Sequence, residues 1–320
     1  MVKALNRALR EAMAADRDVV LLGEDVGVDE GVFRVTEGLL KQFGAERVLD
    51  TPLAEAAIVG MSIGMALYGL KPVCEIQFAG FCYLDYDQLE SHAARIRNRT
   101  RGLYHCQMVL RTPYGGGIRA VEHHSESREA IYTHTPGLKM VIPSGPRNAR
   151  ALLHSAIQDP DPVLFFEPAA LYRTIKEEVP DQLETFPIGK AVVAQSGSDV
   201  TLIAYGAMLR PTLEAANLLA EEGVHAEVID LLSLYPMDTD TIVTSVKKTG
   251  RAVIVHEAPR TCGIAAEVTA RLVEHAFLHL EAPVRRLTGF DIPFPYFARE
   301  KAYLPTASRI ARAVRETLNF

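Results

Sequence analysis

The sequence has no tryptophan and only four cysteines among its 320 residues. These cysteines form no Cys-x-x-Cys pair and no spacing typical of metal ligands: Cys74, Cys82, Cys106 and Cys262. Few, irregularly placed cysteines in a chain of this length argue against a disulfide framework and indicate a reducing compartment.

Long apolar runs and an apolar leader are also missing. The longest apolar stretches fall well short of the ~20 residues that a membrane-spanning helix needs. Residues Met1 to Leu5 lead directly into an amphipathic helix, without the apolar core of a signal peptide or an Arg/Ser-rich transit segment. We therefore expect a cytoplasmic protein that has no membrane contact.

The sequence has little charge of one sign, with a formal net charge of -6. Its densest basic patch alternates with other residues: Arg95, Arg97, Arg99 and Arg101. On a helix these side chains would spread around the surface rather than form one stripe, so we expect no nucleic-acid partner. A solvated helix end or a subunit contact is the simpler interpretation.

Length and pattern together predict an α/β protein. A chain of 320 residues suits two domains of about 150 residues each. Apolar strands alternate with amphipathic helices in both halves, which predicts two doubly wound domains with mainly parallel sheets. We expect the domains at 1–175 and 188–320, joined by a charged, proline-containing linker at 176–187. The strands are expected at 18–23, 71–77, 107–111, 138–142, 163–166, 200–204, 226–229 and 252–255.

A helix that begins at Thr51 and Pro52 contains the most unusual carboxylate. Threonine is a good N-cap and proline suits the first helical position. The body of this helix, 56–67, is almost entirely apolar or small, so it should be buried, and Gly60 and Gly64 should admit another backbone. Glu55 lies one position beyond the capping-box position. It either interacts with the helix dipole or binds a ligand, and the residues alone leave both open.

The segment from Gly115 to Ala120 formally satisfies a degenerate dinucleotide-binding pattern. The residues that follow make a poor helix core, so a tight, mobile loop is the better interpretation. His123 and His124 point different ways and do not suggest a two-histidine metal site. A loop histidine here could act as a general acid or base, or could simply be exposed.

Eight short motifs follow one another along the chain, at 21–25, 50–55, 75–79, 113–117, 124–125, 161–168, 187–190 and 288–293. In this order and spacing they resemble the beta subunit of the first, decarboxylating component (E1) of thiamine-diphosphate-dependent 2-oxo acid dehydrogenase complexes, of the branched-chain or pyruvate type. The resemblance covers essentially the whole chain. It implies a pyrimidine-binding thiamine-diphosphate domain followed by a transketolase C-terminal-like domain.

The resemblance also implies roles for individual residues. Glu55 would bond the aminopyrimidine ring nitrogen and promote its imino tautomer, and His124 would transfer a proton when the lipoyl group is acylated. Phe81 would stack on the pyrimidine. The full cofactor set is Glu24, Leu53, Ala54, Glu55, Gln77 and Phe81, and the substrate set is Phe78, Ala79, Gly80, Phe81 and His124. The turn from Ala156 through Asp159 to Asp161 matches a place where family members hold potassium.

Two features depart from the family pattern, and one motif of complete thiamine-diphosphate enzymes is missing from this sequence. Glu122 and Glu126 add carboxylates near His124, and Gly80 stands where many relatives have Asp or Asn. No Gly-Asp-Gly motif occurs in the sequence. That motif supplies oxygen ligands for the magnesium ion that bridges to the diphosphate. An alpha subunit is therefore expected to hold magnesium and diphosphate in a heterotetramer of two alpha and two beta subunits.

The implied function is that of an oxidoreductase component. With the alpha subunit, the chain would decarboxylate a 2-oxo acid and reductively acylate a lipoyl group on an acyltransferase core. The glycine loop and the segment Leu164 to Pro168 favour branched-chain 2-oxo acids as substrates. The alternatives are a pyruvate dehydrogenase beta subunit and a non-catalytic assembly module of the same fold. Retention of Glu55, Phe81 and His124 argues against the module.

Overall fold

The computed structural model describes all 320 residues, which form two compact units. The first unit comprises residues 1–114 and 131–188, and the second comprises 115–130 and 189–320. Residues 115–130 thus belong to the second unit, although the first unit precedes and follows them in the sequence.

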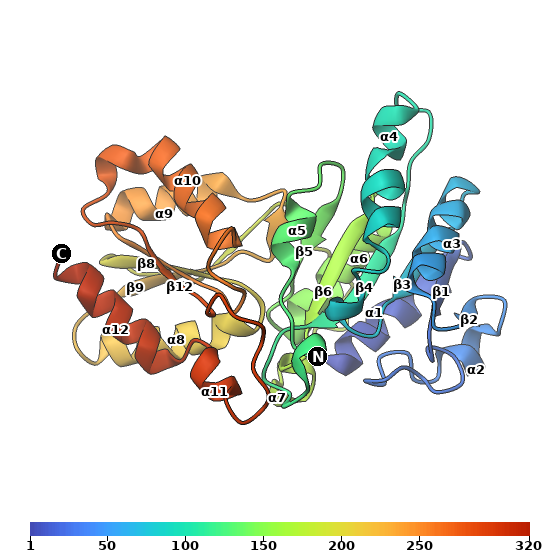
Figure 1. Ribbon diagram of the computed structural model, residues 1–320, viewed down its shortest axis with the longest axis horizontal. Helices are drawn as coiled ribbons and strands as arrows, with labels where there is room; N and C mark the ends of the chain where they lie inside the picture. The colour runs from blue at the N-terminus through green and yellow to red at the C-terminus, as the bar shows by residue number, and fades with distance from the viewer. The chain divides into compact units, whose positions relative to one another are not determined.

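The first unit is built on a parallel sheet whose strands follow the order β5-β6-β4-β3-β1-β2 (Figure 1). These strands are short and largely buried because helices cover both faces of the sheet. Their bounds are β1 (Val19–Gly23), β2 (Val48–Asp50), β3 (Lys71–Glu75), β4 (Val109–Tyr114), β5 (Lys139–Val141) and β6 (Val163–Pro168).

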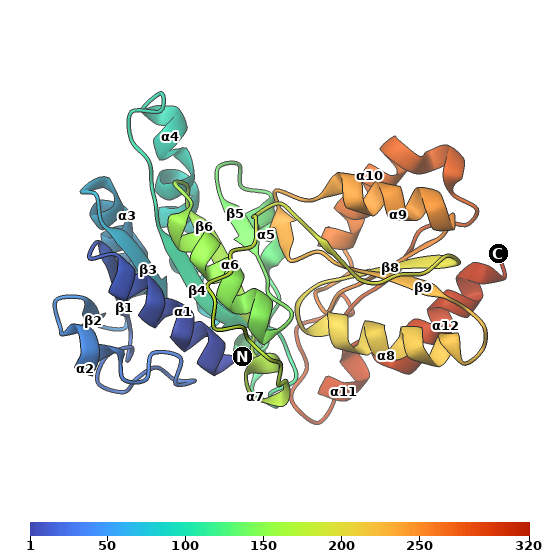
Figure 2. The ribbon, with the colours of Figure 1, turned by 180° about the vertical axis from the view of Figure 1, so that it is seen from behind.

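Two layers of helices cover this sheet. Helices α1 (Val2–Ala15) and α6 (Pro146–Gln158) pack side by side on one face (Figure 2). On the other face lie α3 (Glu55–Leu67) and an irregular helical stretch at 88–99. This stretch is interrupted: its parts are a π-helix Gln88–His92, a 3-10 turn Ala93–Arg95 and α4 (Ile96–Arg99). The shorter helices are α2 (Leu39–Phe43) and α7 (Leu171–Thr174), and α5 (Glu129–Thr133) begins in the second unit and ends in the first.

Helix α3 differs from expectation at its start. It begins at Glu55 with Ala54 as N-cap, so the predicted start at Thr51 and Pro52 is wrong. The Thr51 backbone N–H instead donates to the carbonyl of Gly23 at 3.0 Å, which extends the pairing of β1 with β2. That bond keeps the chain extended and delays the helix.

Helix α3 also differs from expectation in its burial. One side is buried, but Met61 and Leu67 are 43% and 38% exposed, and Gly64 is exposed as well. A Cβ atom at Gly64 would meet nothing within 4 Å, and one at Gly60 would meet only the Gln88 side chain. The prediction of a helix buried on all sides, with another backbone close to its glycines, is therefore wrong for this chain by itself.

The second unit has a sheet with the order β12-β11-β8-β9-β7, parallel except for β7. Helices α8 (Leu209–Ala220) and α12 (Ala307–Leu318) cover one face, and α9 (Thr239–Thr249) and α10 (Ile264–Ala276) cover the other (Figure 1). The remaining elements are β7 (Val192–Gln195), β8 (Val200–Ala204), β9 (Ala226–Asp230), β10 (Ser233–Tyr235), β11 (Ala252–Val255), β12 (Arg285–Leu287) and α11 (Glu300–Tyr303). The predicted α/β class with mainly parallel sheets is confirmed.

None of the helices is both long enough and apolar enough to cross a bilayer. All four cysteines are free thiols, and three of them are buried.

Candidate active site

The carboxyl ends of β1, β2 and β3 bring most of the predicted cofactor residues to one edge of the first sheet. Gly23 pairs with Asp50 on one side and with Glu75 on the other. The segments that follow these strands start with Glu24, Thr51 and Ile76, so they begin side by side. In the sheet, β2 lies on one side of β1 and β3 on the other, so the strand order reverses direction at β1. Ligands of α/β proteins bind beside the carboxyl ends of the strands at such a reversal.

Glu55 occupies the first turn of α3 at this edge. Its side chain is 8% exposed, and its carboxylate accepts no hydrogen bond from elsewhere in the chain. Unlike the oxygens of Asp85, the Glu55 oxygens are not enclosed, so water or a ligand can reach them at the positive end of the helix. Glu55 therefore has unused hydrogen-bonding capacity in a position where a ligand could reach it.

Two further carboxyl groups interact electrostatically with Glu55. Burial raises the pKa of Glu24, and the neighbouring Asp25 and Glu55 carboxylates raise it further. Asp85 is fully buried, and neither of its carboxylate oxygens has a hydrogen-bond partner. Burial, reinforced by Glu55, holds the pKa of Asp85 well above its usual range. Asp85 was not foreseen from the sequence, where it stands only as an acid three positions before the segment Gln88–His92, in which Leu89 alone is buried.

The loop after β1 is held by side chains from neighbouring segments. Gln77 donates through Nε2 to Asp25 Oδ2 at 3.0 Å, which fixes a predicted cofactor residue against the loop. Asp50 accepts from the backbone N–H groups of Gly27 and Val28 at 2.6 and 2.9 Å. A Cβ atom at Gly27 would lie 2.7 Å from Asp50, so this close approach requires glycine.

Aromatic rings follow β3. Ala79, Gly80 and Phe81 form a 3-10 turn, and the Phe78 and Phe81 rings meet edge to face with centroids 5.9 Å apart. Phe78 is nearly buried and Phe81 is half-buried, so Phe81 presents part of its ring to solvent. Leu53 is 69% exposed, which leaves its side chain available at the same edge.

A buried ionic network underlies this edge and was not foreseen from the sequence. Arg111 in β4 is 1% exposed. Its guanidinium donates to both oxygens of Glu167 in β6 and, at 2.7 Å, to Glu75 in β3. Tyr172 donates its hydroxyl to Glu167 at 2.6 Å. The signal was present as charged residues within otherwise apolar strands, which are almost never buried unless paired.

His124 lies in the second unit, in a 3-10 turn formed by Glu122, His123 and His124. The structure thus places it in a different compact unit from Glu55 and the other cofactor residues. Glu126, one of the added carboxylates, pairs with Arg128 at 3.0 Å and approaches His123 at 3.7 Å.

Two acids of the second unit hold the glycine-rich segment that leads to His124. Glu257 Oε2 accepts from the Gly116 backbone N–H at 2.7 Å, and Glu300 Oε2 accepts from that of Arg119 at 3.1 Å. Gly115 adopts a φ of +83°, and a Cβ atom there would lie 2.8 Å from the Glu257 carboxylate. The glycines therefore permit a close wrap around a buried acid, which is a more specific role than loop mobility.

The turn predicted to hold potassium has carboxylates that are already paired. Lys139 Nζ lies 2.7 Å from both oxygens of Asp159, and Arg97 Nε lies 2.6 Å from Asp161 Oδ1. The Ala156 carbonyl accepts from the Asp159 backbone N–H at 3.3 Å. A cation here would depend on main-chain carbonyls, and the potassium site remains a prediction.

Comparison with known protein families also divides the chain into two parts, but it assigns residues 115–130 to the first part rather than to the second. Residues 1–174 match the transketolase pyrimidine-binding domain, and residues 189–310 match the transketolase C-terminal domain. A protein of Acholeplasma laidlawii named pyruvate dehydrogenase E1 component subunit beta is 49% identical over 99% of this chain and 97% of its own length. The chain belongs to the E1 beta-subunit family of thiamine-diphosphate-dependent 2-oxo acid dehydrogenases.

Other E1 beta subunits are about as similar. Those of Staphylococcus epidermidis and Staphylococcus aureus, which carry the same name, are 48% and 47% identical over the whole chain and 98% of their own length. A solved structure described as a split-gene transketolase, inactive beta4 tetramer, superposes with a TM-score of 0.83 over 99% of this chain and 97% of that one. At 23% identity that likeness shows a shared fold.

The residues at the edge of the first sheet fit the pyrimidine half of thiamine diphosphate. An aminopyrimidine offers ring nitrogens and two apolar faces. The unpartnered Glu55 carboxylate suits a ring nitrogen, and the partly exposed Phe81 ring suits a face. The fit rests on the donor and acceptor chemistry of side chains that the fold has already brought together.

Proposed function

We propose that this chain is the beta subunit of a pyruvate dehydrogenase E1 component and supplies the pyrimidine half of a thiamine-diphosphate site. The whole-length identity of 47–49% to proteins named pyruvate dehydrogenase E1 component subunit beta carries this proposal. The branched-chain preference expected from the glycine loop and 164–168 finds no support among these relatives. Those segments are weak guides because part of the acyl pocket would belong to the other subunit.

In this proposal Glu55 holds a proton at the pyrimidine ring nitrogen. Burial and the absence of a competing donor leave its carboxylate available for that bond. Bound thiamine diphosphate would supply the electron sink for decarboxylation, while the protein supplies binding, orientation and proton positioning. Phe81 would pack on the ring. Glu24, Leu53, Ala54 and Gln77 would border it, and Phe78, Ala79 and Gly80 would approach the substrate.

We further propose that His124 moves a proton when the acyl group passes to a lipoyl arm. Hydrogen bonds to Glu257 and Glu300 anchor the segment that leads to His124. These bonds would restrict the motion of the segment and favour a defined position of the histidine. The lipoyl-bearing acyltransferase core would be the partner in that step.

The part of the site that binds the diphosphate would come from an alpha subunit, in a heterotetramer of two alpha and two beta subunits. The sequence has no Gly-Asp-Gly motif to hold magnesium and diphosphate. The exposed apolar side of α3, with Met61, Gly64 and Leu67, gives a surface that a neighbouring subunit would cover.

The test is to mix the chain with its alpha partner, thiamine diphosphate and magnesium, and to follow decarboxylation with an artificial electron acceptor. We expect activity from the mixture and none from either chain alone, with pyruvate turned over faster than 3-methyl-2-oxobutanoate. Turnover by this chain alone would overturn the half-site proposal, and a higher kcat/KM for 3-methyl-2-oxobutanoate would overturn the pyruvate assignment.

A further inference from the structure

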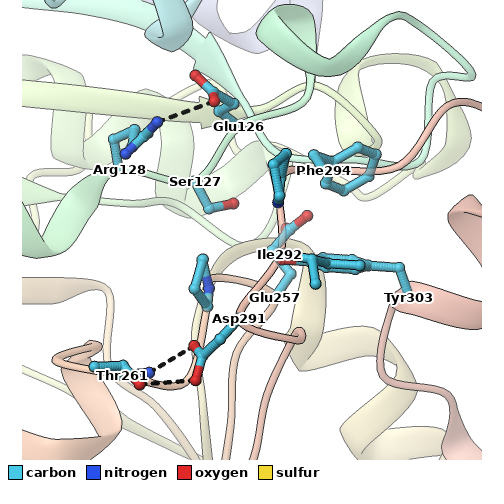
Figure 3. Close-up of a pocket in the computed structure, with 11 residues that line it drawn as sticks. Glu126, Ser127, Arg128, Glu257, Thr261, Asp291, Ile292, Phe294 and Tyr303 are labelled. Atoms are coloured by element: carbon cyan, nitrogen blue, oxygen red, sulfur yellow. Dashed lines mark hydrogen bonds and ion pairs between the residues drawn. The ribbon is translucent and has the colours of Figure 1, made fainter.

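A cavity in the second unit lies outside the cofactor residues described above. Its volume is about 440 Å3, within the range of small-molecule sites. Figure 3 shows the side chains around it, which come from residues 126–128, from the chain after β11 and from 291–303. The lining includes Ser127, Glu257, Phe294 and Tyr303. All of these residues belong to the same compact unit.

Glu257 is the unusual member of this lining. Its side chain is 2% exposed, and only one of its carboxylate oxygens is used, by the Gly116 N–H. The other oxygen, Oε1, is buried and has no hydrogen-bond partner, and the same holds for the Ser127 hydroxyl. Two polar groups that line one cavity thus have unused hydrogen-bonding capacity, and such groups are rare in folded proteins without a bound partner.

No cation compensates Glu257. Burial raises its pKa to about 8, and the carboxylates of Glu129 and Glu300 reinforce that shift. The adjacent His256 could have supplied a positive charge, but burial lowers its pKa to about 4 and keeps it neutral. The remaining charges of the lining are occupied elsewhere: Arg128 pairs with Glu126, and Asp291 accepts from the backbone and hydroxyl of Thr261.

We propose that this cavity binds an organic ammonium group, which donates to Glu257 Oε1 and Ser127 Oγ and packs against Phe294 and Tyr303. A protonated amine offers the donors that both oxygens need and the positive charge that the buried acids lack. Aromatic rings attract such cations through their faces. An anion would be repelled by the acids, and no group of three or more metal-ligating side chains is present in the chain.

Occupancy would act on the segment that leads to His124. An ammonium group favours the ionised form of Glu257, and an ionised carboxylate accepts a stronger hydrogen bond from the Gly116 N–H than a neutral carboxyl does. The site would therefore tighten the glycine loop when it is filled. The binding itself can be measured without turnover, so it stands or falls separately from the proposed function.

The probe for the test is n-butylammonium chloride, titrated calorimetrically into the full chain, both alone and assembled with its alpha subunit. Butyrate and n-butanol are the matched anionic and neutral probes. We expect n-butylammonium to bind at least roughly tenfold more tightly than either, as a charge-assisted hydrogen bond implies. Equal binding of the three probes, or no binding of n-butylammonium, would overturn the proposal.

Variants locate the probe. Glu257→Gln keeps an acceptor for the Gly116 N–H and should weaken n-butylammonium binding roughly tenfold or more. Ser127→Ala removes one acceptor and gives a second measurement if Glu257→Gln does not fold. The matched control is Asp240→Asn, an exposed acid of the same unit, which should not change the affinity. Unchanged affinity in both Glu257→Gln and Ser127→Ala would place the probe elsewhere and contradict the site.

The pH dependence gives an independent readout on the wild-type chain. The titratable and charged groups near Glu257 are Glu126, Arg128, Glu129, His256, Asp291, Glu300 and Tyr303. Because Glu257 must lose its proton to pair with the probe, affinity should rise from pH 6.5 to 8.5. A flat profile would contradict the pairing. Binding to the isolated chain but not to the assembly would show that the alpha subunit fills or closes the cavity and would favour a lysine of that subunit as the natural ammonium. Binding to both would favour a free amine.

Discussion

The Arg111 guanidinium forms a bidentate ion pair with Glu167, with Nε 2.7 Å from Oε1 and Nη2 3.0 Å from Oε2. Both side chains are essentially inaccessible to solvent, and Glu75 occupies the remaining side of the guanidinium at 2.7 Å. The contact joins β3, β4 and β6 just beneath the edge where the cofactor residues lie. One cation thus ties together three neighbouring strands.

Replacing Arg111 with methionine should destabilise the chain by about 3–5 kcal/mol, because two buried carboxylates would lose their cation. Urea unfolding followed by circular dichroism measures the loss. The control is Arg210→Met, which breaks an exposed pair with Glu214 and should cost no more than about 0.5 kcal/mol. If the two variants lost similar amounts of unfolding free energy, the buried network would stabilise the chain no more than an exposed ion pair does.

Replacing Glu55 with glutamine should separate binding from chemistry. Glutamine keeps the shape of the side chain but cannot exchange a proton at a ring nitrogen, so decarboxylation should fall by about 10²–10⁴-fold. Thiamine diphosphate should still bind to the alpha–beta assembly, as measured by calorimetry. The exposed Glu46→Gln is the matched control and should retain full activity. Wild-type rates in Glu55→Gln would show that the proton is held by another group.

Replacing Asp85 with asparagine should stabilise the chain in a pH-dependent way. The folded pKa of Asp85 lies above that of the unfolded chain, so the unfolded state loses its proton first as the pH rises. Wild-type stability from this group is therefore lost as the pH rises above about 4, at up to ~1.4 kcal/mol per pH unit, until the folded carboxyl ionises. The variant escapes this loss.

Urea unfolding at pH 4.5, 5.5 and 6.5 follows the difference between Asp85→Asn and wild type. The difference should widen as the pH increases. Asp87→Asn, an exposed neighbour whose carboxylate accepts from Ser91, serves as the control and should show no such widening. A constant difference for Asp85→Asn would mean that Asp85 is ionised in the folded state.

Changes on the exposed side of α3 should affect assembly and leave the isolated chain intact. Gly64→Arg has room in this chain, so its unfolding midpoint in urea should match or exceed that of wild type, because glycine is a poor helix former. If another subunit covers this side, the large side chain should abolish or strongly weaken the heterotetramer in light scattering. The control is Glu274→Arg, at an exposed position of α10. Normal assembly of Gly64→Arg would exclude this side of α3 from the subunit contact.

The fold class follows from the sequence because apolar strands and amphipathic helices have distinct periods. Those periods depend on residues close together in the chain. The start of α3 was missed because it depends on a distant partner: the bond from Thr51 to Gly23 outweighs the N-cap preference of threonine. The exposure of Met61 and Gly64 could not be foreseen for a similar reason, since an apolar helix looks the same whether its own chain or another subunit covers it.

Sequence motifs predicted some residues of the site. Residues whose importance depends on how the folded chain packs around them could not be predicted. Glu55, Gln77 and Phe81 lie at one sheet edge, as expected for residues that follow parallel strands, although their roles remain predictions. Asp85 and Glu257 were missed because their significance comes from unpartnered oxygens, which only the folded surroundings define. The linker at 176–187 remains a prediction. Local composition suggested it, but local composition does not reveal that residues 115–130 pack with the second unit.

The assignment of residues 115–130 to the second unit limits how this chain could be recombined. A graft that exchanged only the C-terminal half with a relative would separate Gly116 and Arg119 from the acids that hold them, Glu257 and Glu300. The loop and those acids belong to one compact unit although they lie in two separate segments of the sequence. Successful chimeras would therefore need two crossovers that carry both parts together.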